Sequence, residues 1–254
     1  MIITVTNQKG GTGKTTTSIN AAAYLAQLGR KVLLVDLDPQ TNATSGLGVK
    51  VKNGTLYDLL QRDKIPFQDC LQKTDYENLD ILPGSPDLAG LPVEITHLDK
   101  REFRLHEHLQ PISPLYDYII IDSPPSLGLI TINGLVASDK VLIPVQSEYY
   151  ALEGLGQLLQ TVNRISRYVK KMSILGAVLT MHDRRNRLSH QVSKEMKRYF
   201  PGYVFSSIIP RNVSLSEAPS FGKPIHAYAK LSKGAFAYRS LAQEIIDQVE
   251  GRSK

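Results

Sequence analysis

The sequence predicts an α/β protein with a mostly parallel, twisted β-sheet and helices on both faces of that sheet. Short runs rich in Ile and Val alternate along the chain with segments whose apolar residues recur at helical spacing. Glycine-rich or acidic segments follow three of these runs, as is typical where the carboxyl ends of parallel strands form a ligand site. With 42% hydrophobic and 21% charged residues, residues 1–254 are expected to form a single domain.

The first of these segments has the features of a phosphate-binding loop (P-loop). It follows a predicted strand at residues 2–6 and precedes a predicted helix at residues 17–28, which is the order that such a loop requires. Its three glycines let backbone N–H groups approach a polyphosphate, and the helix dipole adds positive potential. Lys14 would reach the terminal phosphates, and the Thr15 hydroxyl would bind Mg²⁺. The residues expected to bind the phosphates are Lys9, Gly10, Gly11, Thr12, Gly13, Lys14, Thr15 and Thr16.

The loop departs from the general pattern at its start. Gln8 stands where that pattern has glycine, and Lys9 adds a second lysine at the mouth of the loop. The resulting K-G-G-x-G-K-T sequence resembles the deviant Walker A family, which includes the ParA/Soj and MinD ATPases, the nitrogenase iron protein and arsenite-pump ATPases. The resemblance implies a P-loop nucleoside triphosphatase fold, ATP and Mg²⁺ as cofactors, and catalytic roles for Lys9 and Lys14.

Two aspartates follow the second predicted strand, at residues 31–35. Ligands gather at the carboxyl ends of parallel strands, so Asp36 and Asp38 are expected beside the P-loop. We expect Asp36 to be structural or to lie behind the metal ligands. Asp38 is the candidate to orient the attacking water and is included in the metal site. The stretch D-L-D-P-Q-x-N-A-T-S-G-L-G resembles a ParA/Soj motif, with Thr41 where that family commonly has glycine.

A third predicted strand, at residues 116–122, is apolar and ends in an aspartate. This is the Walker B pattern, whose carboxylate holds Mg²⁺, often through water. The predicted metal site therefore consists of Thr15, Asp38 and Asp122. The D-S-P-P-S sequence that begins at Asp122 resembles the D-x-P-P loop of the partition ATPases, and it is expected to pass near the γ-phosphate.

The remaining chain predicts further elements of the same kind. Strands are expected at residues 140–145, 174–180 and 204–209, and helices after residue 154 and at residues 235–249.

Two later stretches carry the family resemblance as well. The sequence E-Y-Y-A-L-E-G, residues 148–154, resembles ParA/Soj proteins more than MinD. Residues 210–224 resemble a block whose first residues lie against the adenine base, so Pro210 and Asn212 are expected to bind the nucleotide. Many relatives carry a basic residue that helps to bind DNA where this chain has Ser214, and that contact is therefore not expected here.

Charge is distributed unevenly along the chain. The net charge is +6, but residues 1–159 carry −5 and residues 160–254 carry +11. A basic half indicates a polyanionic partner, nucleic acid before membrane, and a solvated basic surface is the alternative. Arg185 matches the position of a DNA-contacting arginine in the family. The residues expected at a DNA surface are Arg184, Arg185, Arg187, Arg211 and Lys223.

The cysteine content and the hydropathy of the sequence limit the cellular compartments in which the protein is expected. Cys70 is the only cysteine, which excludes a disulfide within the chain and argues against an iron protein, whose subunits each need two cysteines. No signal peptide precedes Ile2, and no run of about 18 apolar residues is present. A cytoplasmic, nucleoid-associated protein without a membrane partner is therefore expected.

The resemblance covers essentially the whole chain and implies a DNA-partitioning ATPase. ATP would close two subunits face to face, with Lys9 of each reaching the phosphates of the other; the alternative is that Lys9 stabilises its own loop. The homodimer would bind double-stranded DNA without sequence preference. A ParB-type partner would stimulate its slow hydrolysis, which returns it to monomers.

The alternative function is a MinD-like ATPase that cycles on a membrane. Such proteins carry a C-terminal amphipathic helix with a basic and an apolar face. Residues 241–249 contain acids and no aromatic residue, so we expect a helix that packs on the core.

Overall fold

The computed structural model describes residues 1–61, 65–148, 153–169 and 172–251. Within them lies a seven-stranded sheet of order β3–β4–β2–β5–β1–β6–β7, parallel throughout except for the antiparallel pair β3–β4. Residues 149–152 of the E-Y-Y-A-L-E-G stretch lie outside the described residues. The strands are β1 (Ile2–Val5), β2 (Val32–Asp36), β3 (Gln72–Lys73), β4 (Leu79–Leu82), β5 (Tyr118–Asp122), β6 (Lys140–Gln146) and β7 (Ser173–Thr180).

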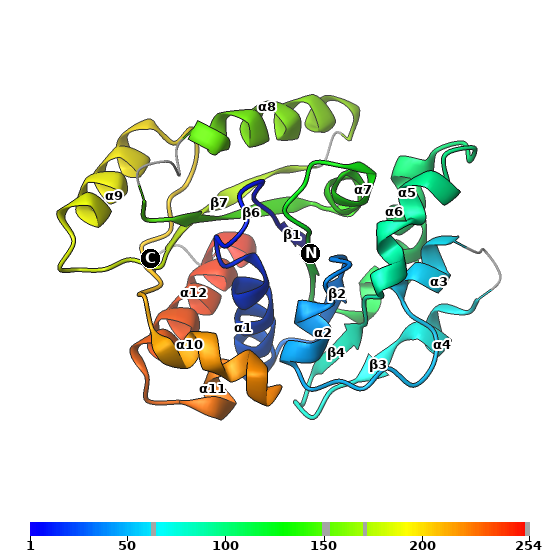
Figure 1. Cartoon of the computed structure of the whole chain (residues 1–254), viewed down its shortest axis with the longest axis horizontal. Helices are drawn as coiled ribbons and strands as arrows, with labels where there is room; N and C mark the ends of the chain where they lie inside the picture. Colours follow the sequence, from blue (N-terminus) through cyan, green and yellow to red (C-terminus); the bar gives the residue numbers. More distant parts are fainter. Residues whose placement is uncertain (62–64, 149–152, 170–171, 252–254) are drawn as a thin grey trace.

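Helices cover both faces of this sheet, so the predicted fold class is confirmed (Figure 1). The α-helices are α1 (Lys14–Gln27), α2 (Asn42–Gly46), α3 (Leu56–Gln61), α4 (Phe67–Cys70), α5 (Leu91–Glu94), α6 (Arg104–Leu109), α7 (Leu129–Ala137), α8 (Glu153–Tyr168), α9 (Arg187–Tyr199), α10 (Val213–Glu217), α11 (Ile225–Tyr228) and α12 (Lys233–Glu250). Short 3₁₀ turns lie at η1 (Pro86–Ala89), η2 (Arg101–Phe103), η3 (Ser113–Leu115) and η5 (Ala218–Phe221).

Alternate residues of the strands point to opposite layers. Ile120 packs with α1 and α12, whereas Ile119 and Ile121 pack with α3, α5, α6 and α7. At the β6–β7 edge of the sheet, these two strands pack on α8 and α9, in the layer that also contains α7. Because both faces are covered, the strands read as continuous apolar runs rather than as an alternating pattern.

The strand register brings the polar strand ends together. Asp36 of β2 lies opposite Asp122 of β5, and Val5, after which the P-loop begins, lies opposite Asp122 on the other side. The carboxyl ends of β1, β2 and β5 therefore meet at one edge of the sheet, where the sequence places its ligand site.

The strand predicted at residues 204–209 is absent, and this prediction is wrong. The segment makes only isolated bridges, such as Ala177 with Val204. Its ladder is interrupted because the backbone N–H groups of Ser206 and Ser207 donate to the carboxylate of Glu244 on α12, at 2.7 and 3.0 Å. A side chain from a distant helix thus takes the donors that a strand would use.

Helix α12, predicted at residues 235–249, is a core helix. It packs along α1, and the hydroxyl groups of Tyr238 and Thr17 lie 3.1 Å apart in the buried interface. Its last turn is anchored by Glu250, which accepts two hydrogen bonds of 2.9 Å from the Arg30 guanidinium. Among the described residues, no helix is both long and apolar enough to cross a membrane.

We expect Leu241→Ala to lower the free energy of unfolding by about 2–5 kcal/mol, because Leu241 is fully buried between α12 and the sheet and its loss leaves a cavity. Gln243→Ala, on the exposed side of the same helix, should change it by less than about 0.5 kcal/mol. Urea denaturation followed by circular dichroism measures both. Equal effects of the two substitutions would contradict the placement of α12 in the core.

Candidate functional site

The P-loop lies between β1 and α1 and is held by contacts to two other strands. The Asn7 side-chain amide donates to the Pro144 carbonyl of β6 at 2.7 Å, and the Thr180 hydroxyl at the end of β7 donates to the Thr12 carbonyl at 2.8 Å. Gly11 and Gly13 have φ values of 73° and 83°, which side chains other than glycine rarely adopt. The loop is therefore pre-shaped by the sheet.

Lys14, the first residue of α1, is a buried cation. Its side chain is folded back into the loop, where its Nζ donates to the Lys9 carbonyl at 3.2 Å. Burial lowers the pKa of Lys14, while the charges of Asp122 and Asp38 oppose that shift. A phosphate group in the loop would compensate the cost of burying this ammonium group.

Asp122 is fully buried at the end of β5. One carboxylate oxygen accepts from the Ser18 hydroxyl at 2.8 Å, and its other oxygen has no hydrogen-bond partner among the described residues. Burial is the main cause that raises the pKa of Asp122 to about 8, and the nearby charge of Asp36 adds to it. A divalent cation at the free oxygen would compensate both the burial of the charged carboxylate and its repulsion by Asp36.

The residues present therefore fit a magnesium ion shared with a nucleotide. The Thr15 side chain lowers the pKa of Asp122 against the larger effect of burial, so the residue predicted to bind Mg²⁺ lies close to this carboxylate. The described residues contain no group of three or more His, Cys, Asp and Glu side chains that could enclose a metal on their own. Magnesium commonly binds through one or two carboxylates together with substrate phosphates, which is the arrangement this site can offer.

Asp36 and Asp38 are both buried but differ in the hydrogen bonds that their carboxylates accept. Asp36 is fully buried and accepts from the backbone and the hydroxyl of Thr44, at 2.7 and 2.6 Å. Burial raises the pKa of Asp36 to about 6, and these hydrogen bonds oppose the shift. Asp38 accepts from the Gln40 N–H at 3.0 Å and lies close enough to act on the charge of Lys14.

Sequence reasoning missed three residues that support these carboxylates. Ser18 and Thr44 are the hydroxyl partners of Asp122 and Asp36. A Cβ on Gly84 would lie 3.1 Å from the carboxylate carbon of Asp36, so a side chain there would displace it. Thr44 stands within the D-L-D-P-Q-x-N-A-T stretch, which was a usable signal, whereas nothing in the sequence links Gly84 to Asp36.

A cavity of about 140 Å³ lies between the P-loop and the segment that joins α9 to α10. Gly13 and Thr16 line one side, and Pro210 and Asn212 line the other. The two residues predicted to contact the base thus lie next to the loop predicted to bind the phosphates.

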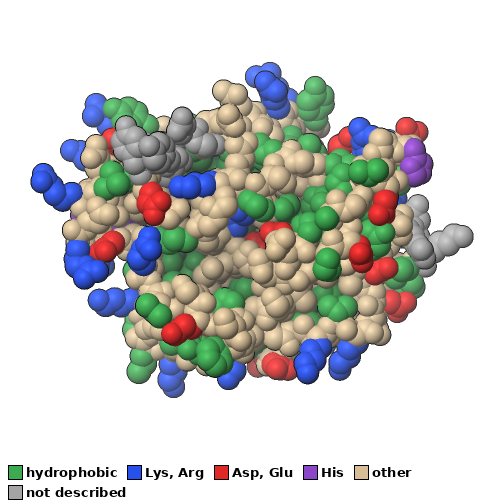
Figure 2. Space-filling model, in the orientation of Figure 1, with side chains coloured by type: hydrophobic (Ala, Val, Ile, Leu, Met, Phe, Trp, Pro, Cys, Tyr) green, Lys and Arg blue, Asp and Glu red, His purple; other side chains and the backbone are tan. Residues whose placement is uncertain are grey.

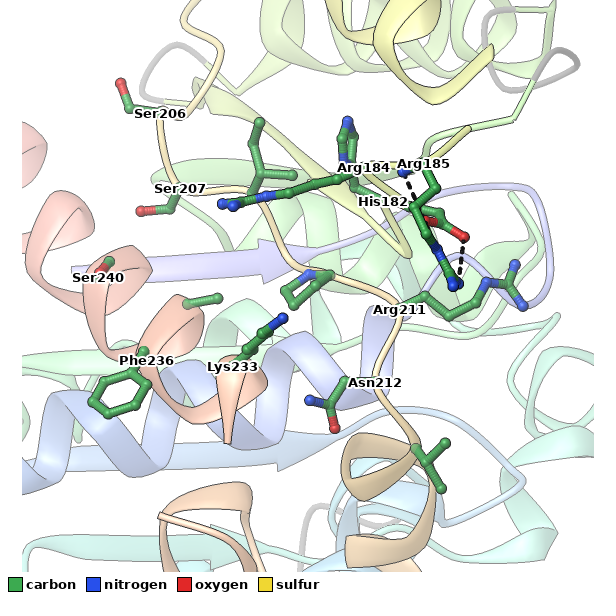
Figure 3. Close-up of a pocket in the computed structure, with 15 residues that line it drawn as sticks. His182, Arg184, Arg185, Ser206, Ser207, Arg211, Asn212, Lys233, Phe236 and Ser240 are labelled. Atoms are coloured by element: carbon green, nitrogen blue, oxygen red, sulfur yellow. Dashed lines mark hydrogen bonds and ion pairs between the residues drawn. The ribbon is translucent and has the colours of Figure 1, made fainter. Parts of the chain in front are cut away.

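A larger groove of about 1090 Å³ continues from the same segment (Figure 3). Arg184 extends across it from the end of β7, and Lys233 points into it from the start of α12. Arg185 also lines the groove and pairs with Asp183, Nε to Oδ1 at 3.3 Å. Phe236, near Lys233 on α12, also lines the groove and is 54% exposed. Cations and an exposed aromatic ring thus share one concave surface.

The predicted DNA-contacting residues are only partly brought together. Arg184, Arg185 and Arg211 line the groove, whereas Arg187 is the first residue of α9 and Lys223 follows η5, both outside its lining. All five are exposed. Figure 2 shows Lys and Arg side chains gathered at the end of the molecule that carries α9.

Comparison with known proteins identifies the family. A family model described as "AAA domain" matches residues 1–174. The chromosome partitioning protein ParA of Myxococcus xanthus is 52% identical over 248 residues, which is 96% of this chain and 87% of that protein. The chain belongs to the ParA/Soj family. The resemblance inferred from the P-loop and the later motifs is confirmed.

Solved structures show how widely the ParA/Soj fold is shared. Cobyrinic acid a,c-diamide synthase from Mycobacterium smegmatis, with bound ADP and magnesium, superimposes with a TM-score of 0.87 at 33% identity, covering 100% of this chain and 96% of that one. MinD from Pyrococcus horikoshii, in complex with Mg-ADP, gives a TM-score of 0.80 at 28% identity, covering 100% and 98%. The ParA/Soj assignment therefore depends on sequence identity as well as on fold.

We expect Gly13→Ala to lower the free energy of unfolding by about 1–2 kcal/mol, because Gly13 has a left-handed backbone that a Cβ disfavours. An added Cβ at Gly13 would make only ordinary van der Waals contacts, the nearest to Thr180 Cγ2 at 3.8 Å, so the cost is backbone strain. Gly10→Ala is the matched control, since Gly10 has neither a positive φ nor an atom within 4 Å of the added Cβ. Thermal unfolding measures the stability of both variants. An equal loss in the two would contradict the left-handed backbone at Gly13.

Proposed function

We propose that this chain is a partitioning ATPase that binds and hydrolyses ATP with Mg²⁺, closes into a dimer on ATP and binds DNA in that state. The observation that carries the proposal is the site at the sheet edge. There, a buried lysine in a phosphate-shaped loop lies near a buried Asp122 oxygen without a partner. Both features are costly in the protein alone, and both are compensated by a magnesium–nucleotide complex.

Each part of the nucleotide has residues to receive it. The loop N–H groups and Lys14 bind the phosphates, and Pro210 and Asn212 contact the base across the small cavity. Thr15, Asp38 and Asp122 form the metal site. When bound, Mg²⁺ neutralises charge that develops on the phosphate oxygens.

Asp38 orients the attacking water. It is the carboxylate near Lys14 that is not saturated by a neighbouring threonine, in contrast to Asp36. Phosphoryl transfer needs little covalent help from the protein, so catalysis consists mainly of positioning and charge stabilisation. An isolated subunit lacks the Lys9 of a facing subunit, so we expect slow hydrolysis until a second subunit and a ParB-type partner complete the site.

Dimerisation supplies that cation from Lys9. The Lys9 side chain lies at the mouth of the P-loop and is 37% exposed, so it is available to a facing subunit. In the single chain it contacts Glu148 through Nζ. Two subunits that face each other across their P-loops would each donate Lys9 to the phosphates of the other.

DNA binding follows from the basic half of the chain. The groove cations Arg184, Arg185 and Arg211 are exposed arginines, which suit phosphate oxygens and carry little sequence information. One subunit offers few phosphate contacts, and the closed dimer doubles them. The protein would therefore occupy the nucleoid only in its ATP-bound state.

The MinD-like alternative lacks an observation in its favour beyond the shared fold. A membrane-binding helix needs a free apolar face. The apolar face of α12 is buried against α1 and the sheet, and its last turn is tied to Arg30. Fold alone does not decide function, and MinD and the diamide synthase share this fold.

Lys14→Ala and Asp38→Ala separate binding from hydrolysis. Lys14→Ala should weaken ATP binding about 10- to 100-fold, because a charge-assisted contact to the terminal phosphates is lost. Asp38→Ala should bind ATP within about threefold of wild type and hydrolyse it at least about 100-fold more slowly, since water positioning acts on the barrier. Calorimetry and phosphate release measure the two quantities. Normal hydrolysis by the Asp38 variant would move the catalytic role elsewhere.

Arg185→Glu should weaken ATP-dependent DNA binding while ATP binding and dimerisation persist. If the closed dimer neutralises about six phosphates, log affinity falls against log salt with a slope near −5, and losing one contact per subunit makes the slope about 2 units shallower. Lys52→Glu, the same charge change at an exposed site in the acidic half, is the control. Filter binding on two unrelated duplexes tests this, and a flat salt dependence or a strong preference for one duplex would contradict a nonspecific DNA surface.

A further inference from the structure

One carboxylate, that of Glu148, connects the P-loop to the groove. Lys9 Nζ lies 3.8 Å from its Oε2, and the Arg211 guanidinium lies 3.5 Å from its Oε1. The Gln146 side-chain amide donates to the same Oε1 at 2.7 Å. Two cations from distant parts of the chain therefore share a single acidic partner, and a neutral amide orients it.

The backbone around these groups is fixed by neighbouring elements. Ser147, which precedes Glu148, donates its N–H to the Thr180 carbonyl of β7 at 3.0 Å and accepts from the Ser189 hydroxyl of α9. The Arg211 N–H donates to the His182 carbonyl at 3.1 Å. The Lys9 N–H donates to the Asn7 side chain at 3.1 Å. The side chains thus meet because three separate backbone segments hold them at one place.

We infer that Glu148 is a positioning residue that holds Lys9 within its own subunit until ATP-driven closure transfers Lys9 to the phosphates of the facing subunit. The inference rests on the proposed function, in which Lys9 acts across the dimer. Lys9 has one ammonium group, so its contact with Glu148 competes with its contact to a phosphate. Gln146 and Arg211 keep the carboxylate in reach of Lys9.

The strength of the contact suits a reversible restraint. Its side chains are 37% and 46% exposed, and ion pairs of this kind contribute little, so a multiply charged triphosphate displaces the carboxylate readily. Once Lys9 leaves, Glu148 retains Arg211 and Gln146 as partners and is not left unpaired. The exchange therefore leaves no isolated charge behind.

The first experiment measures the restraint in the nucleotide-free protein. The mobility of the Lys9 ammonium group is followed by ¹⁵N relaxation of lysine side chains in wild type and Glu148→Gln. We expect a more mobile Lys9 ammonium in the variant, and an unchanged signal for Lys230, which is exposed. Glu217→Gln, which removes a carboxylate bonded to Tyr228, is the matched charge control. Unchanged Lys9 mobility would overturn the inference whatever the protein does with ATP.

The second experiment measures the consequence for closure. By light scattering, Glu148→Gln should dimerise at an ATP concentration about three- to ten-fold lower than wild type, because two exposed ion pairs no longer have to break. The difference should shrink at high salt, which screens exposed pairs but would not cancel a packing defect. Glu148→Asp, which keeps the charge on a shorter side chain, should fall between the two.

The outcomes separate the two proposals. A folded Glu148→Gln protein that needs more ATP, or the same amount, would overturn the restraint, because Glu148 would then support the closed state or be neutral. If Lys9 becomes mobile in the variant while wild type forms no ATP-dependent dimer, the restraint stands and the proposed function fails.

Discussion

The close approach of three carboxylates at one edge of the sheet is the constraint on which the rest of the site depends. Parallel pairing of β2 and β5 places Asp36 directly opposite Asp122, with Asp38 two residues on. Burial raises the pKa of both Asp36 and Asp122, and the charge of a neighbouring carboxylate adds to the shift of each. Thr44 and Ser18 offset part of the cost, and Lys14 supplies one nearby positive charge. One buried Asp122 oxygen still has no partner among the described residues, and a bound cation would compensate it.

The P-loop is bonded to strands other than its own. Asn7 reaches β6 and Thr180 of β7 reaches the Thr12 carbonyl, so the ends of β6 and β7 define the loop. The segment between α9 and α10 is bonded to this region as well, because the Ile209 N–H donates to the Leu179 carbonyl of β7 and the His182 N–H donates to the Ile209 carbonyl. The P-loop and the segment that lines the groove therefore both contact the end of β7.

The sequence predicts the central sheet well because each central strand is a short apolar run with a polar end, a pattern set by burial on both faces. It fails at residues 204–209, where Glu244 takes the backbone donors, a competition that no local pattern contains. The positions of the loop and its aspartates were predictable because each lies at or directly after the end of a buried strand, and the carboxyl ends of parallel strands lie at one edge of the sheet. Their supports, Gly84 and Ser18, were not, since they are brought to the carboxylates only by the fold.

The sequence also predicts the basic residues after residue 160 only in part. Their placement in the structure indicates how the nucleotide site and the groove are connected. Composition locates an excess of cations after residue 160 but not the faces on which they lie. The apolar face of α12 is committed to the core, so the groove draws its cations from the end of β7, from the 210–212 segment and from the first turn of α12. Pro210 and Asn212 line both the groove and the small cavity beside Gly13. A base seated there would touch the segment that carries Arg211, so nucleotide occupancy would act directly on the arrangement of the groove cations.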